Sequence, residues 1–363
     1  MSTAQNVLQG DERAALALRA LYRDHGYTQY KMNKFEEYDL YAKNKDFLVS
    51  DSVITFTGTN GKLLALKPDV TLSIIKNATE EKGTKNKVFY SENVYRISGG
   101  TREYKEIMQM GLECIGDIDL YDTYEVISLA KNSLESISSD FVLEISHMGV
   151  VSGVLSKITG DEEFCKKALE CIEKKSTHTL LDLCQQYNIS KPDAEAICSL
   201  ASLYGTPDSV LQKLSLLEKS YDISEYTSEL KEIWSLLEDD TNSDKIRFDF
   251  SIVNDMNYYN GIVINGFING ICECVLFGGN YDKLLYKMGK KCSGVGFAIY
   301  TDLLSSLNER PSEYDVDTLV IYNESTSPKK LKETVDSLIL EGKSVSAQKS
   351  APNKLRYKEK IDI

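Results

Sequence analysis

One stretch of the sequence, from about residue 160 to residue 240, limits the possible folds most, because it carries only helical patterns between strand-like segments. Residues 190–193 (SKPD) are typical of a helix start with proline in the first turn. Apolar residues then recur at helical spacing as far as Leu237. An insertion of this kind argues against alternating βαβ units along the whole chain. We therefore predict an α+β fold in which an antiparallel sheet flanked by helices carries an all-α insertion at about 160–240.

Strand-like runs on both sides of the insertion supply the predicted sheet. Residues 53–66 contain two apolar runs around a glycine-containing turn, which predicts a hairpin. Two short strands are indicated at 88–90 and 94–96, and another at 108–115. After the insertion, residues 248–269 return to strand patterns.

The 363 residues are enough for one large core and a smaller piece. After Pro311, the patterns over 318–347 indicate a strand, a helix and a second strand. We therefore predict a core at residues 1–308 and a small β-α-β region at residues 309–363.

The charge balance excludes some partners. The chain has 42 basic and 55 acidic residues and a formal charge of −13, which opposes long-range attraction of nucleic acid. No run approaches the roughly 18 apolar residues of a membrane span. Residues 1–24 contain no long apolar run and so do not resemble a signal peptide. We predict a cytoplasmic protein without a nucleic-acid or membrane partner.

The eight cysteines are scattered through the chain, and only Cys272 and Cys274 come close together in sequence. In a strand these two side chains would share a face, but no second Cys or His pair accompanies them. We predict buried free thiols, no metal site and no cofactor.

Four segments together resemble the class II synthetase core in its histidyl form, over most of residues 10–305. They are LALKPDVT (64–71), VYRISGGTREYKEIMQMGLECIG (94–116), VNDMNYYNGIV (253–263), and FGGNYDKLL (277–285) with GVGFAIYTDLL (294–304). Two families share this pattern, the histidyl-tRNA synthetases and the ATP phosphoribosyltransferase regulatory subunits. The aspartate of KPDVT, where the synthetase usually has glutamate, is similar to the regulatory subunits.

The resemblance implies a pocket for histidine or a similar ligand. Its expected residues are Asp69, Thr71, Arg96, Gln109, Glu113, Tyr258 and Tyr259. Asp69 and Thr71 match the groups that hold the α-ammonium, and a carboxylate with a hydroxyl suits its three donors. Glu113 and Tyr259 match the pair that recognises the imidazole, whose two nitrogens differ in character. Gln109 matches a contact to the main-chain part of the amino acid, and Arg96 matches the arginine of the second synthetase motif.

Simpler interpretations stand beside these assignments. Asp69 is equally well placed to cap a helix that begins near Thr71. Glu113 lies in an apolar strand, where a buried carboxylate needs a partner. Tyr258 and Tyr259 would point to opposite faces of a strand, which would leave at least one of them as ordinary core or surface. His147, at a strand end, is expected to be structural.

The cations that adenylate formation needs are missing from the expected pocket. Asn254, Asn280 and Leu303 stand where the synthetase pattern has arginine, and Asn257 stands where it has aspartate. Lys67 replaces the arginine before Pro68. Arginine stabilises shifting phosphate charge best, by bidentate hydrogen bonding. These replacements argue against an adenylating enzyme.

The resemblance therefore implies a non-catalytic regulatory subunit of ATP phosphoribosyltransferase. Such a subunit assembles with a separate short-form catalytic subunit, forms a homodimer within a hetero-oligomer, and serves feedback by L-histidine. Residues 310–363 are too few for an anticodon-binding domain of about 90–100 residues. The alternatives are a divergent histidyl-tRNA synthetase and a synthetase-like binding module that has lost histidine.

Overall fold

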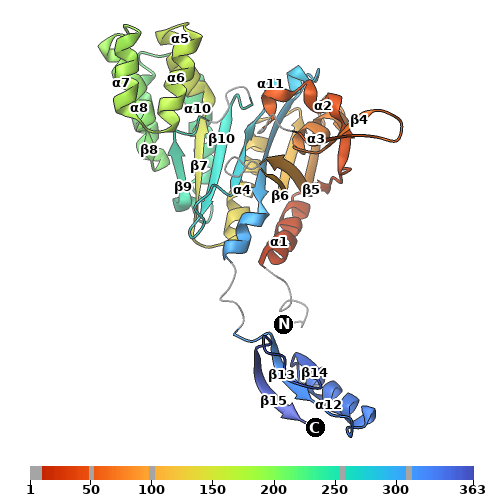
Figure 1. Cartoon of the computed structure of the whole chain (residues 1–363). Coiled ribbons are helices and arrows are strands. Elements are labelled where there is room, and N and C mark those ends of the chain that lie inside the picture. The colour runs from red at the N-terminus through yellow and green to blue at the C-terminus, as the bar shows by residue number, and fades with distance from the viewer. Residues whose placement is uncertain (1–9, 49–52, 98–102, 254–257, 308–312) are drawn as a thin grey trace. The chain divides into compact units, whose positions relative to one another are not determined.

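The computed structural model describes residues 10–48, 53–97, 103–253, 258–307 and 313–363 (Figure 1). The chain divides into a larger unit, Ala14–Ser306, and a smaller unit that includes Leu307–Ile363. No helix among the described residues has the length and apolar character needed to span a bilayer.

A nine-stranded sheet organises the larger unit, in the order β1-β5-β6-β12-β11-β10-β7-β9-β8. Its strands are β1 (Thr28–Gln29), β5 (Lys85–Ile97), β6 (Tyr104–Gly116), β7 (Phe141–His147), β8 (Tyr204–Gly205), β9 (Ile246–Asp249), β10 (Ile262–Ile268), β11 (Leu276–Asn280) and β12 (Ser293–Tyr300). Neighbouring strands are antiparallel except for β1–β5 and β7–β9, which are parallel. The predicted α+β class with a mainly antiparallel sheet is confirmed.

Strands β5 and β6 form one long hairpin, in register from Lys85 opposite Gly116 to Ile97 opposite Tyr104. The prediction of two short strands at 88–90 and 94–96 is therefore wrong. Polar residues between these two runs do not interrupt the strand, because β6 pairs with it along its whole length.

Helices α1 (Gly10–Asp24) and α4 (Leu120–Ile137) pack together on one face of the sheet. The hydroxyls of Tyr22 and Ser133 are 3.0 Å apart, and the Tyr22 ring lies 5.9 Å from that of Phe89. Because successive strand residues point to opposite faces, Tyr90 and the residues in register with it face the other side. A capping box of Asp119 and Asp122 starts α4. The face of the sheet opposite to α1 and α4 therefore carries the site that is described below.

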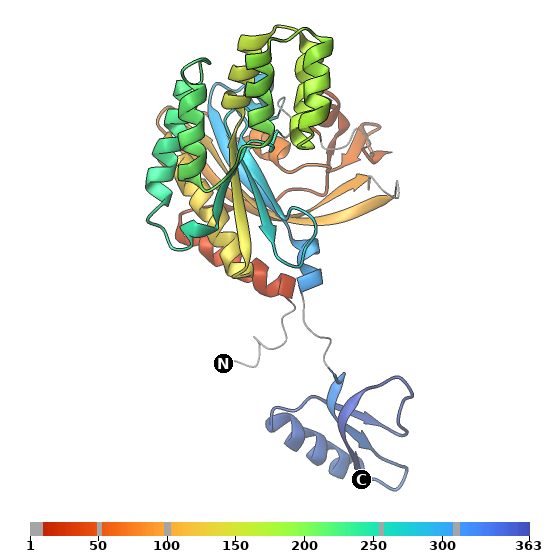
Figure 2. The same cartoon turned by 90° about the vertical axis from the view of Figure 1, so that its left-hand side faces the viewer.

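Six helices follow β7: α5 (Met148–Ile158), α6 (Glu162–Glu173), α7 (Thr177–Gln186), α8 (Lys191–Ala201), α9 (Pro207–Leu217) and α10 (Ser224–Leu237). The Ser190 hydroxyl caps α8, with proline in its first turn. Strand β8 lies within this stretch and pairs with β9, so the prediction of helices alone is wrong there. In Figure 2 the yellow-green helices lie at the top of the core and α1, in red, at its bottom.

A second, smaller sheet and several short helices complete the larger unit near the site that is described below. A three-stranded antiparallel sheet has the order β2-β4-β3 and confirms the predicted hairpin at 53–66. Its strands and the neighbouring helices are β2 (Phe35–Glu37), β3 (Thr55–Thr57), β4 (Leu63–Leu66), α2 (Tyr38–Ala42), η2 (Lys45–Phe47), α3 (Thr71–Asn77) and α11 (Asp282–Lys287). Short 3₁₀ turns, η3 (Ser243–Lys245) and η4 (Thr301–Leu307), lie elsewhere in the chain.

The smaller unit contains β13 (Val316–Ile321), α12 (Pro328–Leu340), β14 (Val345–Gln348) and β15 (Tyr357–Asp362). Its sheet is parallel, in the order β14-β13-β15. The predicted strand, helix and strand are present, but β15 was not predicted. Four of its six residues are charged, and this composition conceals an edge strand, which natural sheets often protect with charged side chains.

Candidate ligand-binding site

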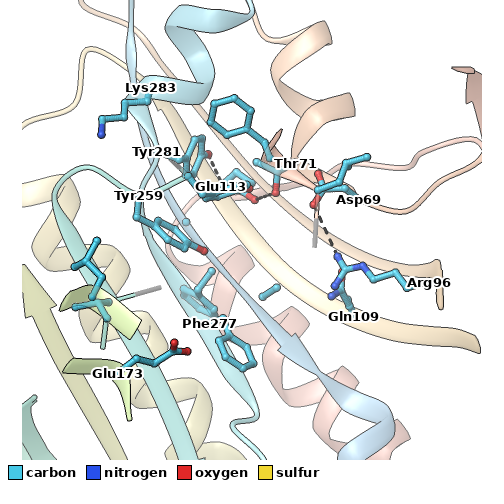
Figure 3. A pocket seen from close by; sticks show the side chains of 18 of the residues that line it. Asp69, Thr71, Arg96, Gln109, Glu113, Glu173, Tyr259, Phe277, Tyr281 and Lys283 are labelled. Carbon is cyan, nitrogen blue, oxygen red and sulfur yellow. Dashed lines mark hydrogen bonds and ion pairs between the residues drawn. The ribbon is translucent and has the colours of Figure 1, made fainter. Parts of the chain in front are cut away.

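A cavity of about 1040 Å³ lies between the sheet, the start of α3, helix α6 and the segment before β10 (Figure 3). All seven residues predicted for the pocket line it. They are Asp69, Thr71, Arg96, Gln109, Glu113, Tyr258 and Tyr259. The fold thus brings together segments that lie far apart in the sequence, and ligand binding by these residues stays a prediction.

Glu113 lies on β6, and its carboxyl group is buried and held at both oxygens. The Thr71 hydroxyl donates to Oε1 over 2.8 Å, and the Tyr281 hydroxyl donates to Oε2 over 2.5 Å. Burial raises the pKa of Glu113 to about 8, although both hydrogen bonds act in the opposite direction. The expected partner for this buried carboxyl therefore exists, and near neutral pH the group is largely protonated.

Gly296 on β12 stands opposite Glu113 in the sheet register. A Cβ atom at this position would collide with Glu113 Oε2 and with the Leu112 carbonyl oxygen. Only glycine leaves room for the Glu113 side chain to lie flat against the sheet.

Asp69 and Arg96 form a charged pair at the wall of the cavity. Asp69 Oδ1 accepts from the Leu72 backbone N–H over 2.9 Å, and Oδ2 lies 3.9 Å from Arg96 Nη2. Asp69 thus caps α3 and also lines the cavity, so both sequence interpretations fit the same geometry. Burial raises the pKa of Asp69, and the Arg96 charge opposes that rise.

The Arg96 guanidinium is fixed by two further contacts. Its Nε donates to the Pro68 carbonyl oxygen over 2.7 Å, and its Nη1 donates to the Tyr300 hydroxyl over 2.9 Å. A guanidinium has five N–H donors, so this arrangement leaves some of them for a ligand.

Gln109 lies next to Arg96 in Figure 3 and is only 2% exposed. Its side-chain amide makes no hydrogen bond within the part of the chain that the structure describes. Its amide is not among the fully buried polar atoms without a partner, so it is open to the cavity that it lines. Its donor and acceptor are therefore suited to a ligand.

Tyr258 and Tyr259 lie in the segment before β10 and not within a strand, so the prediction that they point to opposite faces is wrong. Their ring centroids are 4.7 Å apart and both rings line the cavity. Tyr259 packs on Gly279, whose φ of +152° and close approach to this ring both favour glycine. The preceding residues, among them Asn254 and Asn257, lie outside the described part of the chain.

Tyr281 and the wall formed by α6 were not predicted. Tyr281 stands within the segment FGGNYDKLL, but the sequence does not show that its hydroxyl reaches β6. Helix α6 contributes Glu162, Cys165, Lys166, Leu169, Glu170 and Glu173 to the cavity. Their spacing places them along one side of a helix, and this is the only sequence signal they carry.

Carboxyl groups outnumber cations among the described residues of the cavity wall. The acids are Asp69, Glu113, Glu162, Glu170 and Glu173, and the bases are Arg96, Lys166 and Lys283. Lys166 and Lys283 are exposed, so Arg96 is the buried cation of this set. The balance suits a ligand that carries an ammonium and disfavours a triphosphate.

The three described positions that replace synthetase arginines, Lys67, Asn280 and Leu303, supply no charge to the cavity wall. Lys67 is buried and pairs with Glu92 in a separate, smaller cleft. The Asn280 side chain accepts from the Ile262 backbone N–H over 3.0 Å and so joins β11 to β10. Leu303 is half-buried in η4.

The remaining sequence predictions concern His147 and the cysteines. His147 caps α5 through Nδ1 and approaches Glu229 through Nε2 at 3.0 Å, which agrees with a structural role. Cys272 and Cys274 lie before β11 and not in a strand, so their predicted arrangement is wrong. The eight cysteines are free, but only Cys114 and Cys184 are buried and Cys272 is exposed, so the prediction of buried thiols is wrong for most of them. Within the described ranges, no three His, Cys, Asp or Glu side chains are grouped so as to hold a metal.

Residues 8–304 match the family model of histidyl-tRNA synthetase. The ATP phosphoribosyltransferase regulatory subunit of Caldanaerobacter subterraneus subsp. tengcongensis is 30% identical over 302 residues, which cover 81% of this chain and 78% of that protein. Relatives of the same name from other bacteria are 25–29% identical.

Solved structures share the fold. An ATP phosphoribosyltransferase regulatory subunit/histidyl-tRNA synthetase from Bacillus halodurans has a TM-score of 0.76 at 23% identity, covering 97% of this chain and 93% of that one. A chain of the ATP phosphoribosyltransferase (HisG:HisZ) complex from Thermotoga maritima has a TM-score of 0.64 at 19% identity, with 80% and 97% covered. This chain therefore belongs to the histidyl-tRNA synthetase family and, within it, to the ATP phosphoribosyltransferase regulatory subunits.

Proposed function

We propose that this chain is the non-catalytic subunit that a short-form ATP phosphoribosyltransferase needs for activity and for histidine feedback in the first step of histidine biosynthesis. Its membership of the regulatory subunits supports this function. The separate catalytic partner is supported by the fold shared with a chain of the Thermotoga maritima complex, which is described as HisG:HisZ.

The composition of the cavity wall is the observation that carries the proposal. Asp69 offers a carboxylate to an α-ammonium, while Arg96 and Gln109 offer donors to a carboxylate. A zwitterionic amino acid satisfies both groups at once. The same wall offers a triphosphate one buried cation, so it supports amino-acid binding without adenylation.

Histidine fits the remaining part of this site. Its ring would lie toward Tyr259, whose hydroxyl can donate to or accept from an imidazole nitrogen. Bound histidine changes activity only if it binds one state of the assembly better than another. We place this regulation in the cytoplasm, in a homodimer joined through α1 and the following strand and held within a hetero-oligomer.

Reconstitution tests the proposal directly. The purified chain is mixed with a purified short-form catalytic subunit, and formation of phosphoribosyl-ATP is followed with and without L-histidine. We expect activity in the mixture only, and inhibition by histidine. Equal activity of the catalytic subunit alone would contradict the proposal.

A further inference from the structure

Tyr300 is the last residue of β12 and lies opposite Gln109 of β6 in the sheet register. Side chains of directly opposed strand residues point to the same face, with Cβ atoms about 5 Å apart. Both residues line the cavity. The Tyr300 ring meets the Phe277 ring edge-on, with centroids 5.5 Å apart, and this contact packs one side of the ring. Strand β12 therefore brings a phenol to the end of the cavity where Arg96 lies.

The hydroxyl of Tyr300 has an unused donor. Its oxygen accepts a hydrogen bond from Arg96 Nη1 over 2.9 Å. A phenol can also donate its hydrogen, and the part of the chain that the structure describes offers no acceptor for it. A hydroxyl that already accepts from a cation is polarised, which makes it a better donor. This hydrogen is thus left for an occupant of the cavity.

Arg96 is held so that its other donors lie beside this hydroxyl. Its Nε and Nη1 donate to the Pro68 carbonyl oxygen and to Tyr300, and these two bonds fix the plane of the guanidinium. Its Nη2 lies 3.9 Å from Asp69 Oδ2, which is too long for a hydrogen bond. Figure 3 shows Gln109 beside Arg96, and the amide of Gln109 adds further donors. Donors from β5, β6 and β12 therefore meet at one end of the cavity.

A carboxylate is the group that suits these donors. Its two oxygens accept several hydrogen bonds, and its single negative charge matches a single guanidinium. A phosphate dianion would bring more charge than Arg96 balances, and it would be repelled by the neighbouring Asp69 carboxylate.

This group of donors lies apart from the ring subsite at Glu113. Glu113 follows Gln109 by four residues on β6. Its register partner is Gly296, four residues before Tyr300 on β12. Four residues span about 13 Å of strand, and the side chains that reach in from both ends shorten this gap. One amino acid can therefore place its ring at Glu113 and its carboxylate at Tyr300.

We propose that Tyr300 is a specificity-determining residue for the carboxylate of the amino-acid ligand, because it fixes the Arg96 guanidinium and donates its own hydrogen to a carboxylate oxygen. This inference rests on the proposed amino-acid site. It leaves the ring of the ligand at Glu113 and Tyr259 and its ammonium at Asp69. It assigns the carboxylate to donors from β5, β6 and β12.

Tyr300→Phe tests this role, since it keeps the ring against Phe277 and removes the hydroxyl. The full-length chain and the variant are titrated calorimetrically with L-histidine and with L-histidinol, which has a hydroxymethyl group in place of the carboxylate. A hydrogen bond to a charged group is stronger than one to a neutral group. We expect the variant to bind L-histidine about tenfold more weakly and L-histidinol less than about threefold more weakly. A merely structural role would weaken both ligands alike.

Tyr95→Phe is the matched control, because it removes a hydroxyl from the residue that precedes Arg96 on β5. The Tyr95 side chain points to the opposite face of the strand, where its hydroxyl donates to Glu106 over 3.0 Å. This variant should leave both affinities unchanged.

Nuclear magnetic resonance of the bound ligand observes the carboxylate directly. L-Histidine is isotope-labelled at the carboxylate carbon and in the ring, and spectra are recorded at saturation for the three chains. We expect Tyr300→Phe to shift the carboxylate resonance and to leave the ring resonances in place, whereas Tyr95→Phe should shift neither. If L-histidinol binds to none of the chains, these resonances decide.

Four results would overturn the inference: equal weakening of both ligands by Tyr300→Phe, unchanged affinity for L-histidine, an unshifted carboxylate resonance, or no binding of L-histidine by the unaltered chain. Activation of the catalytic subunit by the unaltered chain is assayed separately. If the ligand results are as expected and activation is absent, the proposed function fails while the role of Tyr300 stands.

Discussion

The buried carboxyl of Glu113 should make the stability of the chain depend on pH. Its pKa is about 8 in the folded chain, against an ordinary value of 4.5. Between these values the folded state binds one proton more than the unfolded state. The free energy of unfolding therefore falls as pH rises, by about 1.4 kcal/mol per pH unit. The stabilisation is fully present below the unfolded pKa and is lost by the time pH exceeds the folded pKa.

Glu113→Gln removes this proton and keeps the shape of the side chain. The amide oxygen can still accept from one of the hydroxyls of Thr71 and Tyr281, and the other hydroxyl can rotate to accept from the amide. From about pH 5.5 to about pH 7.5, the unaltered chain should lose roughly 2–3 kcal/mol more stability than the variant.

Urea denaturation of both proteins at the two pH values measures how much more stability the unaltered chain loses than the variant. A group with a raised pKa that does not interact with Glu113, such as Glu144, is present in both proteins and cancels. Parallel pH profiles for the two proteins would refute the argument. So would a variant that loses more stability than the unaltered chain as the pH rises.

Two further substitutions test the geometry around the cavity. Gly296→Ala should cost about 1–3 kcal/mol of stability, because its Cβ collides with Glu113, and thermal unfolding should show a lowered midpoint; an unchanged midpoint would contradict the close packing. Lys67→Met should cost about 3 kcal/mol, because it leaves Glu92 without its buried partner, yet histidine affinity measured by calorimetry should not change. A large loss of affinity in this variant would place Lys67 in the binding site after all.

The sequence predicts the elements whose patterns are local. The hairpin at 53–66 and the start of α8 follow from turn and capping residues that act over a few positions. Asp69 and Glu113 could be singled out through the family resemblance. Their meeting in one cavity depends on the sheet order, which no local pattern contains.

The predictions that failed, and the contacts that were not predicted, have physical reasons of the same kind. Tyr258 and Tyr259 escape strand alternation because they precede β10, and a turn removes the two-residue period. The hydroxyl of Tyr281 reaches Glu113 across the sheet, and Glu173 reaches the cavity from the insertion. Contacts of this type arise from tertiary packing and leave no spacing in the sequence to detect.

Histidine-dependent exchange between ATP and pyrophosphate measures the central claim most directly. The purified chain is incubated with L-histidine, ATP, Mg²⁺ and labelled pyrophosphate, and label in ATP is counted beside an active histidyl-tRNA synthetase. A cavity that holds an amino acid but offers one buried cation to a triphosphate should give no exchange above background, although histidine binds. Exchange that requires histidine would show that the chain forms an adenylate and would contradict the account.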